Sequence, residues 1–275
     1  MSSTATQQAE SEKYLLKLSL TRQELIVLVA IFVLTSLAWA YTVHLAKVME
    51  ASMTAMADMP DMPAMSMNTA PWGLVDVTAT FVMWAVMMVA MMLPSATPAI
   101  TIFARASQKR EPGALLTPTA AFASGYLASW TLYSLAATGL QWLLHVLAML
   151  NGQMAINSSF ITGCMLVVVG VYQWSPWKYN CLKHCQSPIG FIFGHWRPGA
   201  GGAFRMGLEH GFYCIGCCWL LMMLLFAVGI MNLVWVAGIA IYVLLEKLLP
   251  LSHRLSQLTG VVVIAWGVLV LVGFE

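Results

Sequence analysis

Charged side chains are scarce in this 275-residue chain: Asp, Glu, Lys and Arg make up 9% of the residues, against about 25% in an average soluble domain. Together with a hydrophobic content of 60%, this scarcity excludes an ordinary water-soluble globule. The sequence also lacks a basic stripe, which argues against nucleic-acid binding. It has no Gly-rich phosphate loop of the Walker type, which argues against ATP-driven pumping. The short alternating segments of a membrane β-barrel are absent as well.

The sequence contains several long apolar runs. They lie at residues 25–46, 74–103, 115–148, 155–174, 208–229, 231–250 and 257–273. Because about 20 apolar residues cross a bilayer as a helix, the sequence predicts an all-α, polytopic transmembrane bundle of about seven helices. The lipid bilayer is therefore one expected partner of the chain.

The distribution of Lys and Arg predicts the orientation of this bundle. If the seven runs cross the membrane in turn, almost all Lys and Arg residues lie on the same side as the N-terminus. Lys47 alone lies on the opposite side. Cytoplasmic segments of membrane proteins are rich in Lys and Arg, so we expect the N-terminus inside and the C-terminus outside. A flexible cytoplasmic tail (1–24) then precedes a helical domain (25–275), which has a Met-rich outer loop (47–73) and a Cys-containing inner loop (175–207).

The first helix has an alternative interpretation as a signal peptide. Ala38 and Ala40 flank Trp39 after a basic leader and an apolar run, as at a cleavage site. The leader is long and apolar sequence continues to Ala46, which favours retention of the helix. Cleavage would leave six helices in the same orientation.

Methionine is concentrated in the expected outer loop, where it recurs at every third position: Met53, Met56, Met59, Met62 and Met65. Pro60 and Pro63 oppose a regular helix, and a three-residue period keeps these side chains on one side of an extended, polyproline-like segment. Thioether sulfur is a soft, neutral ligand that suits Cu(I), so the spacing favours capture of copper(I) or of another soft metal such as silver. The alternative is a flexible loop whose methionines bind nothing.

A second methionine pattern lies in the second apolar run. Met83, Met87 and Met91 recur every four residues and stack on one helix face. Such a stripe usually serves packing in a membrane helix. A ligand role is most plausible for Met91 and Met92, which lie near the bend that the following prolines predict.

Five of the six cysteines lie in two short clusters. Cys181 and Cys185 belong to the expected inner loop, and Cys214, Cys217 and Cys218 lie at the start of the fifth expected helix. Thiols on the cytoplasmic side stay reduced, so metal or redox chemistry is favoured over structural disulfides.

His210 precedes the second cluster and shares a helix face with it. At 100° per residue, His210, Cys214 and Cys217 fall within an arc of about 60°. Thiolate and imidazole groups bind soft or borderline metals, and Glu209 is a candidate ligand or a partner that orients His210. Since the loop can fold back over the helix start, we predict one metal site, with the ligands Cys181, Cys185, His210, Cys214, Cys217 and Cys218. Alternatively, the helix cysteines are packing residues and the loop pair is unrelated to them.

Three motifs occur in order along the chain: WAVMMVAMMLP, YQWSPWKYNCLKHCQSP, and GLEHGFYCIGCCWLLMMLLFAVGIMNL followed by LLEK. Over about residues 75–273 they resemble a bacterial family of predicted metal-binding integral membrane proteins, a domain of unknown function. The resemblance implies metal binding in the bacterial cytoplasmic (inner) membrane without naming a substrate. It points to Met91, Met92, Cys181, Cys185, His210, Cys214, Cys217 and Cys218. The Met-rich loop lies outside the three motifs.

The function that these patterns favour is the handling of copper(I) by a membrane protein, in transport, delivery or insertion. Thioethers outside, a Met-lined helix and thiolates inside form a gradient of ligand strength for Cu(I). The expected partners are the metal ion and a metallochaperone or membrane complex. Two alternatives stay open: a membrane thiol oxidoreductase using Cys214 and Cys217, and a non-catalytic assembly or sensor subunit with a structural metal site. No catalytic residue can be named, and the patterns favour a function without catalysis over the enzyme alternative.

Overall fold

The computed structural model of the protein describes residues 22–57, 72–110, 116–151, 154–249 and 252–273. Within these ranges the chain is helical and has no strand, apart from an isolated β-bridge between Leu150 and Ile156. The expected all-α fold is therefore confirmed.

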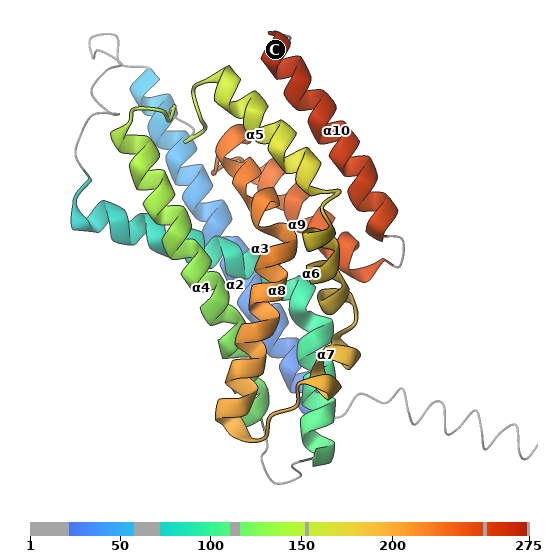
Figure 1. Ribbon diagram of the computed structural model, residues 1–275. Helices are drawn as coiled ribbons and strands as arrows, with labels where there is room; N and C mark the ends of the chain where they lie inside the picture. The colour runs from blue at the N-terminus through green and yellow to red at the C-terminus, as the bar shows by residue number, and fades with distance from the viewer. Residues whose placement is uncertain (1–21, 58–71, 111–115, 152–153, 250–251, 274–275) are drawn as a thin grey trace, which may run out of the picture.

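The long helices form one bundle, in which the start of α2 and the C-terminus lie at opposite ends (Figure 1). The helices of the described residues are α2 (Arg22–Ala57), α3 (Leu74–Arg110), α4 (Thr117–Val146), α5 (Ser159–Tyr172), α6 (Pro176–Gln186), α7 (Pro188–Gly194), α8 (Gly199–Val228), α9 (Leu233–Leu248) and α10 (Ser252–Val272). α3 runs through Pro94 and Pro98 without ending, and it changes direction along its length (Figure 1).

Four of the described helices are long and apolar enough to cross a membrane: the part of α2 up to Ser52, α3, α8 and α10. α5 and α6 would make a fifth span if counted together, although they are bent by 61°. The expected number of seven is not reproduced. α5 has 14 residues and α9 has 16, because the turns that end at the N-caps Ser158 and Asn232 take up part of each apolar run. Both helices are shorter than the roughly 20 residues that a bilayer requires.

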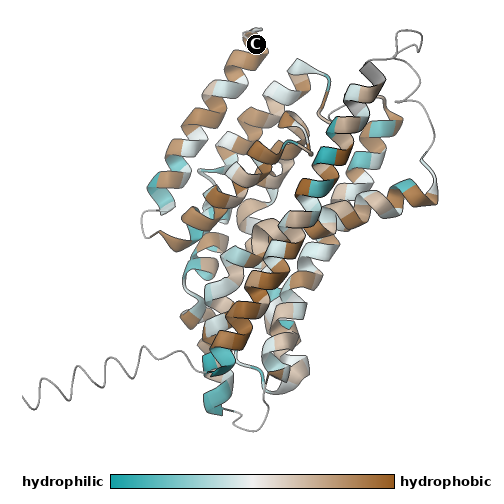
Figure 2. Cartoon of the chain, turned by 180° about the vertical axis from the view of Figure 1, so that it is seen from behind, coloured by the Kyte–Doolittle hydropathy of each residue, from teal (hydrophilic) through white to brown (hydrophobic). Residues whose placement is uncertain are grey.

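The outer surface of the bundle is apolar. α2 is hydrophobic along its middle and hydrophilic near its ends (Figure 2). Large side chains such as Phe32 on α2 and Val262 on α10 are exposed. Extended apolar surfaces of this kind mark contact with a membrane or with another protein.

α4 and α8 approach each other so closely that only glycine fits between them. A Cβ added at Gly207 of α8 would lie 1.9 Å from the carbonyl oxygen of Phe122, and one at Gly125 of α4 would lie 2.0 Å from that of Phe204. Small residues permit this approach between membrane helices. It brings the neighbouring Tyr126 against α8, where its side chain is fully buried.

Two segments expected to be loops are largely helical. The inner loop expected at 175–207 contains α6, α7 and the first two turns of α8. α8 begins at Gly199, directly after Pro198, so Cys214 lies halfway along the helix and not at its start. The expectation placed the start too late because it followed hydrophobicity, and the polar, Gly-rich stretch before residue 208 continues the same helix.

α2 likewise continues into the Met-rich segment that was expected to be an outer loop. It ends at Ala57, so Met53 and Met56 lie in a helix and not in an extended strand of polyproline type. Met59, Met62 and Met65 lie outside the described residues. Of the expected tail at 1–24, the structure describes only Arg22 to Glu24, which begin α2.

Candidate metal site

Three thiols gather in the middle of α8. Cys214, Cys217 and Cys218 are all buried, with Cys214 exposing 1% of its surface. The thiols of Cys217 and Cys218 donate to the carbonyl oxygen of Cys214, at 3.0 and 2.9 Å. Helical periodicity therefore places them on one buried face, as the spacing predicts.

α6 brings the other pair of cysteines to this face. Ser175 caps the helix by accepting a hydrogen bond from the backbone of Trp177, and Pro176 occupies the first turn. The Cys185 thiol lies close enough to those of Cys214 and Cys217 to interact with both. The structure thus joins the two cysteine clusters that the sequence separates.

Cys181 meets α8 at a different point. Its Sγ would lie 2.7 Å from a Cβ added at Gly216, so the glycine leaves the space into which this sulfur projects. Cys181 is therefore near the thiol group, but it packs against the backbone of α8, whereas Cys185 contacts the sulfur of Cys214.

Lys247 adds a positive charge to the thiol group. Its Nζ donates to Sγ of Cys214 at 2.8 Å and to Oγ of Ser95 at 2.9 Å. The lysine exposes only 8% of its surface, and its helix, α9, ends one residue later. A buried ammonium group requires a compensating anion, and a thiolate in contact with it satisfies that requirement.

Tyr126 contacts the same sulfur from α4. Its hydroxyl oxygen lies 3.1 Å from Sγ of Cys214 and donates to the carbonyl oxygen of Met92, also at 3.1 Å. Cys214 is thus the centre of the arrangement, because groups from α4, α6 and α9 all reach its sulfur atom.

His210 lies one turn before Cys214 on α8 and is buried, with 3% of its surface exposed. Its ring packs among those of Phe122, Tyr126 and Phe191, with centroids 5.4 to 6.1 Å apart. Among the described residues, Nδ1 of His210 has no hydrogen-bond partner. Buried polar atoms are nearly always paired, so this nitrogen is a candidate ligand or proton acceptor.

The remaining candidates lie at varying distances from the thiols. Met91 and Met92 are buried in the core, and Met92 is linked to the site through its carbonyl oxygen. The carboxylate of Glu209 pairs with Arg197 at 3.1 Å and with Arg205 at 3.4 Å, so the structure directs it to arginines and not to His210.

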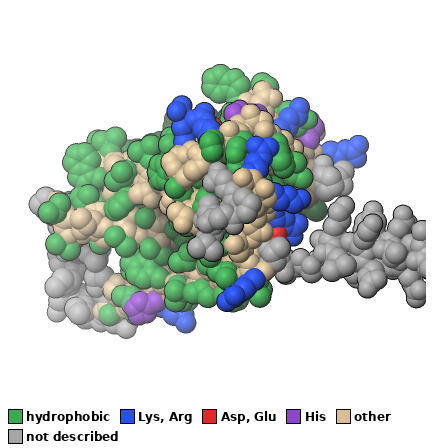
Figure 3. Space-filling model, turned by 90° about the horizontal axis from the view of Figure 1, so that it is seen from below, with side chains coloured by type: hydrophobic (Ala, Val, Ile, Leu, Met, Phe, Trp, Pro, Cys, Tyr) green, Lys and Arg blue, Asp and Glu red, His purple; other side chains and the backbone are tan. Residues whose placement is uncertain are grey.

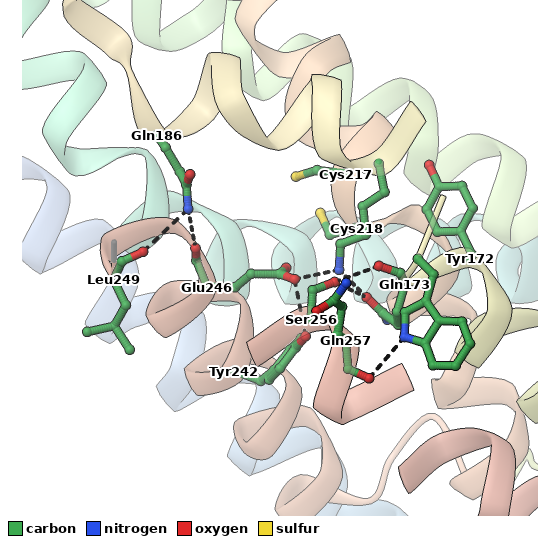
Figure 4. Close-up of polar contacts among 12 residues, drawn as sticks. Tyr172, Gln173, Gln186, Cys217, Cys218, Tyr242, Glu246, Leu249, Ser256 and Gln257 are labelled. Carbon is green, nitrogen blue, oxygen red and sulfur yellow. Dashed lines mark hydrogen bonds and ion pairs between the residues drawn. The ribbon is translucent and has the colours of Figure 1, made fainter. Parts of the chain in front are cut away.

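A buried polar network holds α6 against α9 and α10 (Figure 4). Lys178 of α6 forms an ion pair with Glu246 of α9, and both side chains are at most 1% exposed. Lys178 also donates to the side-chain oxygen of Gln173. The backbone carbonyl oxygen of Gln173 accepts a hydrogen bond from the hydroxyl of Ser256 on α10, at 2.9 Å. The hydroxyl of Tyr242 donates to Glu246 at 3.1 Å. Because Glu246 precedes Lys247, the network also positions the lysine that contacts Cys214.

The donors fit a soft monovalent ion better than zinc. Among the described residues, no three His, Cys, Asp or Glu side chains form a group that could hold a metal ion. A structural Zn(II) site needs four such ligands in a tetrahedron. Cu(I) selects thiolates, and the adjoining thiols of Cys185 and Cys214 supply a two-sulfur arrangement.

Sequence reasoning missed Lys247, Tyr126 and Ser95. In the sequence, Lys247 counts only among the basic residues that indicate the cytoplasmic side, whereas in the structure it is buried against a sulfur atom. The available signal was the Glu-Lys pair at the end of an apolar run, since ionisable residues within membrane segments are usually functional. Tyr126 and Ser95 carry no local signal that separates them from other polar residues in apolar helices.

Comparison with known proteins identifies one family. A family model named PpoB2 and described as a copper chaperone matches residues 81–270. No curated protein and no solved structure matches the chain. The matched region contains α4, α6, α8, α9 and most of α3 and therefore every residue in contact with Cys214. The match also supports the copper-related function that the methionine and cysteine patterns of the sequence favour. Because the match extends over well more than half of the chain, the protein belongs to the PpoB2 family of copper chaperones.

Proposed function

We propose that the protein is a membrane-embedded chaperone that binds copper(I) between Cys185 and Cys214 and delivers it to a partner protein. The observation that carries this proposal is the meeting of thiols from α6 and α8 beside Lys247, in a chain of a copper-chaperone family. Cys217, Cys218, Cys181 and His210 surround these two cysteines, but among the described residues they do not form a group of three ligands with them. Further ligation by these side chains during loading or release would require them to move. The partner is a metallochaperone or a membrane complex that receives the ion.

Replacement of the central thiol tests the metal site. We expect the purified full-length protein in detergent to bind a single tight equivalent of Cu(I) or Ag(I) and to leave Zn(II) unbound, because soft thiolates select these ions. Cys214→Ser and Cys185→Ser are each expected to abolish tight binding, measured as metal content after gel filtration with a competing chelator. The double variant should be little worse than either single variant, because both cysteines hold the same ion.

Cys164→Ser is the matched control, since Cys164 lies on α5 and is half-buried like Cys185. This variant should retain full metal content. Losses that add up in the Cys185/Cys214 double variant would indicate two independent sites. Unchanged metal content in both single variants would show that these cysteines only pack.

The two alternatives of the sequence analysis are less well supported. The thiol oxidoreductase required Cys214 and Cys217 at a helix start, where the helix dipole favours a thiolate, but Cys214 lies in the middle of α8. A sensor or assembly subunit with a structural metal would retain its ion when mixed with an acceptor. A chaperone should transfer it, and that transfer is the measurement that separates the two.

We further propose that the chain lies in the bacterial inner membrane with its N-terminus inside and its C-terminus outside. Lys and Arg side chains gather at the end of the bundle seen from below, where few acidic ones are visible (Figure 3). This is the end at which α2 and α8 begin and α3 ends, with Lys109 and Arg110 in its last turn (Figure 1). The positive-inside rule places such an end in the cytoplasm.

Labelling of single cysteines from outside the cell tests this orientation. In a cysteine-free variant, the substitution Trp72→Cys is expected to introduce a thiol that reacts with a membrane-impermeant maleimide in intact cells. The thiol introduced by Lys109→Cys should react only after the cells are opened. Equal reactivity of the two positions in intact cells would overturn the proposed orientation.

The Met-rich segment is proposed as a site for initial capture of copper(I). A synthetic peptide of residues 49–67 is expected to bind Cu(I) and not Zn(II), since thioethers are soft, neutral ligands. Titration in competition with a chromophoric chelator measures both affinities. A control peptide with norleucine in place of every methionine should bind neither ion, and equal binding of Zn(II) and Cu(I) by the native peptide would contradict a role in capture.

A further inference from the structure

A cleft of about 290 Å³ opens between α3, α9 and the turn that joins α6 to α7. Its lining includes Ser95, Cys185, Ile189 and Lys247. Three of these residues belong to the thiol arrangement: Cys185 and Lys247 contact Cys214, and Ser95 accepts a hydrogen bond from Lys247. The cleft therefore leads from the surface, where Ile189 is exposed, to the groups that surround the buried sulfur of Cys214.

The position of Cys185 makes it the first thiol on this path. Its side chain is half-buried and lines the cleft, whereas Cys214 and Cys217 are buried behind it. An ion that moves along the cleft meets Cys185 first and can then be shared with Cys214, because the two thiols lie close enough to interact.

The positive charge of Lys247 determines which net charge of a metal complex is favoured in this cleft. The ammonium group lines the cleft, whereas the Cys214 thiolate that it contacts is buried behind it, so the positive end of this pair faces an incoming ion. A free cation is therefore repelled and an anionic complex is attracted. A Cu(I) ion held by two thiolates carries one negative charge, which the ammonium group balances. A Zn(II) ion held by the same two thiolates would be neutral, and the buried ammonium would then lack a compensating charge.

We propose that copper(I) enters through this cleft as an anionic bis-thiolate complex of a small thiol, exchanges first onto Cys185 and then onto Cys214, and is held there as an anion balanced by Lys247. This inference rests on the proposed function and names the chemical form of its substrate. In the exchange, two Cu–S bonds to the small thiol break and two Cu–S bonds to Cys185 and Cys214 form. Because Cys214 is already the thiolate paired with Lys247, only the proton of Cys185 is released. One small thiol leaves with that proton, the other leaves as a thiolate, and copper remains Cu(I) throughout.

The charge at the mouth of the cleft provides the test. Loading of the purified full-length protein is followed by stopped flow with two donors, the anionic glutathione complex of Cu(I) and the cationic acetonitrile complex. Ile189→Glu is expected to slow loading from the glutathione complex about tenfold, because the new carboxylate repels an anion. Loading from the acetonitrile complex should not be slowed. The neutral variant Ile189→Gln is the matched control, and its rate should stay within about twofold of the wild type for both donors.

Lys247→Met tests the inner end of the cleft. This variant is expected to bind Cu(I) at least about tenfold more weakly and to lose most of its preference over Zn(II), because the compensating charge is gone. Lys183→Met removes an exposed lysine from α6 and should change neither affinity.

Equal slowing of both donors by Ile189→Glu, or an unchanged Cu(I) preference in a folded Lys247→Met protein, would overturn the inference. If Lys247→Met does not fold, the comparison of donors in the Ile189 variants decides alone. A wild-type protein that takes Cu(I) from neither donor would overturn the proposed function itself. A wild-type protein that binds Cu(I) but shows no donor dependence in the Ile189 variants would overturn only the inference about the cleft.

Discussion

Gly207→Ala is expected to destabilise the protein by more than about 3 kcal/mol, at the upper end of the cost of overpacking a core. The added methyl group would lie 1.9 Å from the carbonyl oxygen of Phe122, an atom of the α4 backbone that no rotamer change can move. α4 and α8 must separate to admit it, and Tyr126 would then withdraw from Cys214. Thermal unfolding of the detergent-solubilised protein measures the loss, and the reactivity of Cys214 with a small maleimide should rise in parallel.

Gly139→Ala is the control on the partner helix. A Cβ at Gly139 of α4 would meet no atom within 4 Å, so the substitution adds no clash. Alanine is favoured over glycine in a helix by about 0.5–1 kcal/mol, and this variant should be unchanged or slightly more stable. If the two variants unfold at the same temperature, close approach at Gly207 is not what joins α4 to α8.

Lys178→Met is expected to cost about 3–5 kcal/mol, the typical penalty for breaking a buried ion pair by removing one partner. Glu246 is 0% exposed, and its charge would lose the ammonium group that compensates it. Because Lys178 lies on α6 and Glu246 precedes Lys247 on α9, the loss should also loosen Cys185 relative to Lys247. We expect a lower unfolding temperature together with weaker retention of Ag(I).

Two further variants test whether the loss of stability in Lys178→Met comes from the broken ion pair. Lys178→Met combined with Glu246→Leu removes both charges and should recover most of the lost stability, since an apolar pair often replaces a buried ion pair at little cost. Arg205→Met removes one of the two arginine partners of Glu209, and it should cost less than about 1 kcal/mol because Arg205 is 68% exposed. A double variant as unstable as Lys178→Met would show that the lysine acts through its packing and not through its charge.

Local properties of this protein could be predicted from its sequence. Helical structure follows from long apolar runs that lack strand alternation, and the shared face of His210, Cys214 and Cys217 follows from helical periodicity. That face was predicted correctly although the start of α8 was placed at 208 and the helix begins at Gly199, because periodicity does not depend on where a helix begins. The number of membrane spans was harder to predict, because hydrophobicity continues through the turns before α5 and α9.

The composition of the site was decided by tertiary structure. Cys185 reaches Cys214 because residues expected to form a loop fold into α6, which packs on α8 and is held to α9 by the ion pair of Lys178 and Glu246. Lys247 lies in the last turn of an apolar helix, and that local pattern is the same whether a lysine faces the membrane surface or a buried sulfur. Which of the two occurs depends on how helices far apart in sequence cross, and only their packed arrangement determines that.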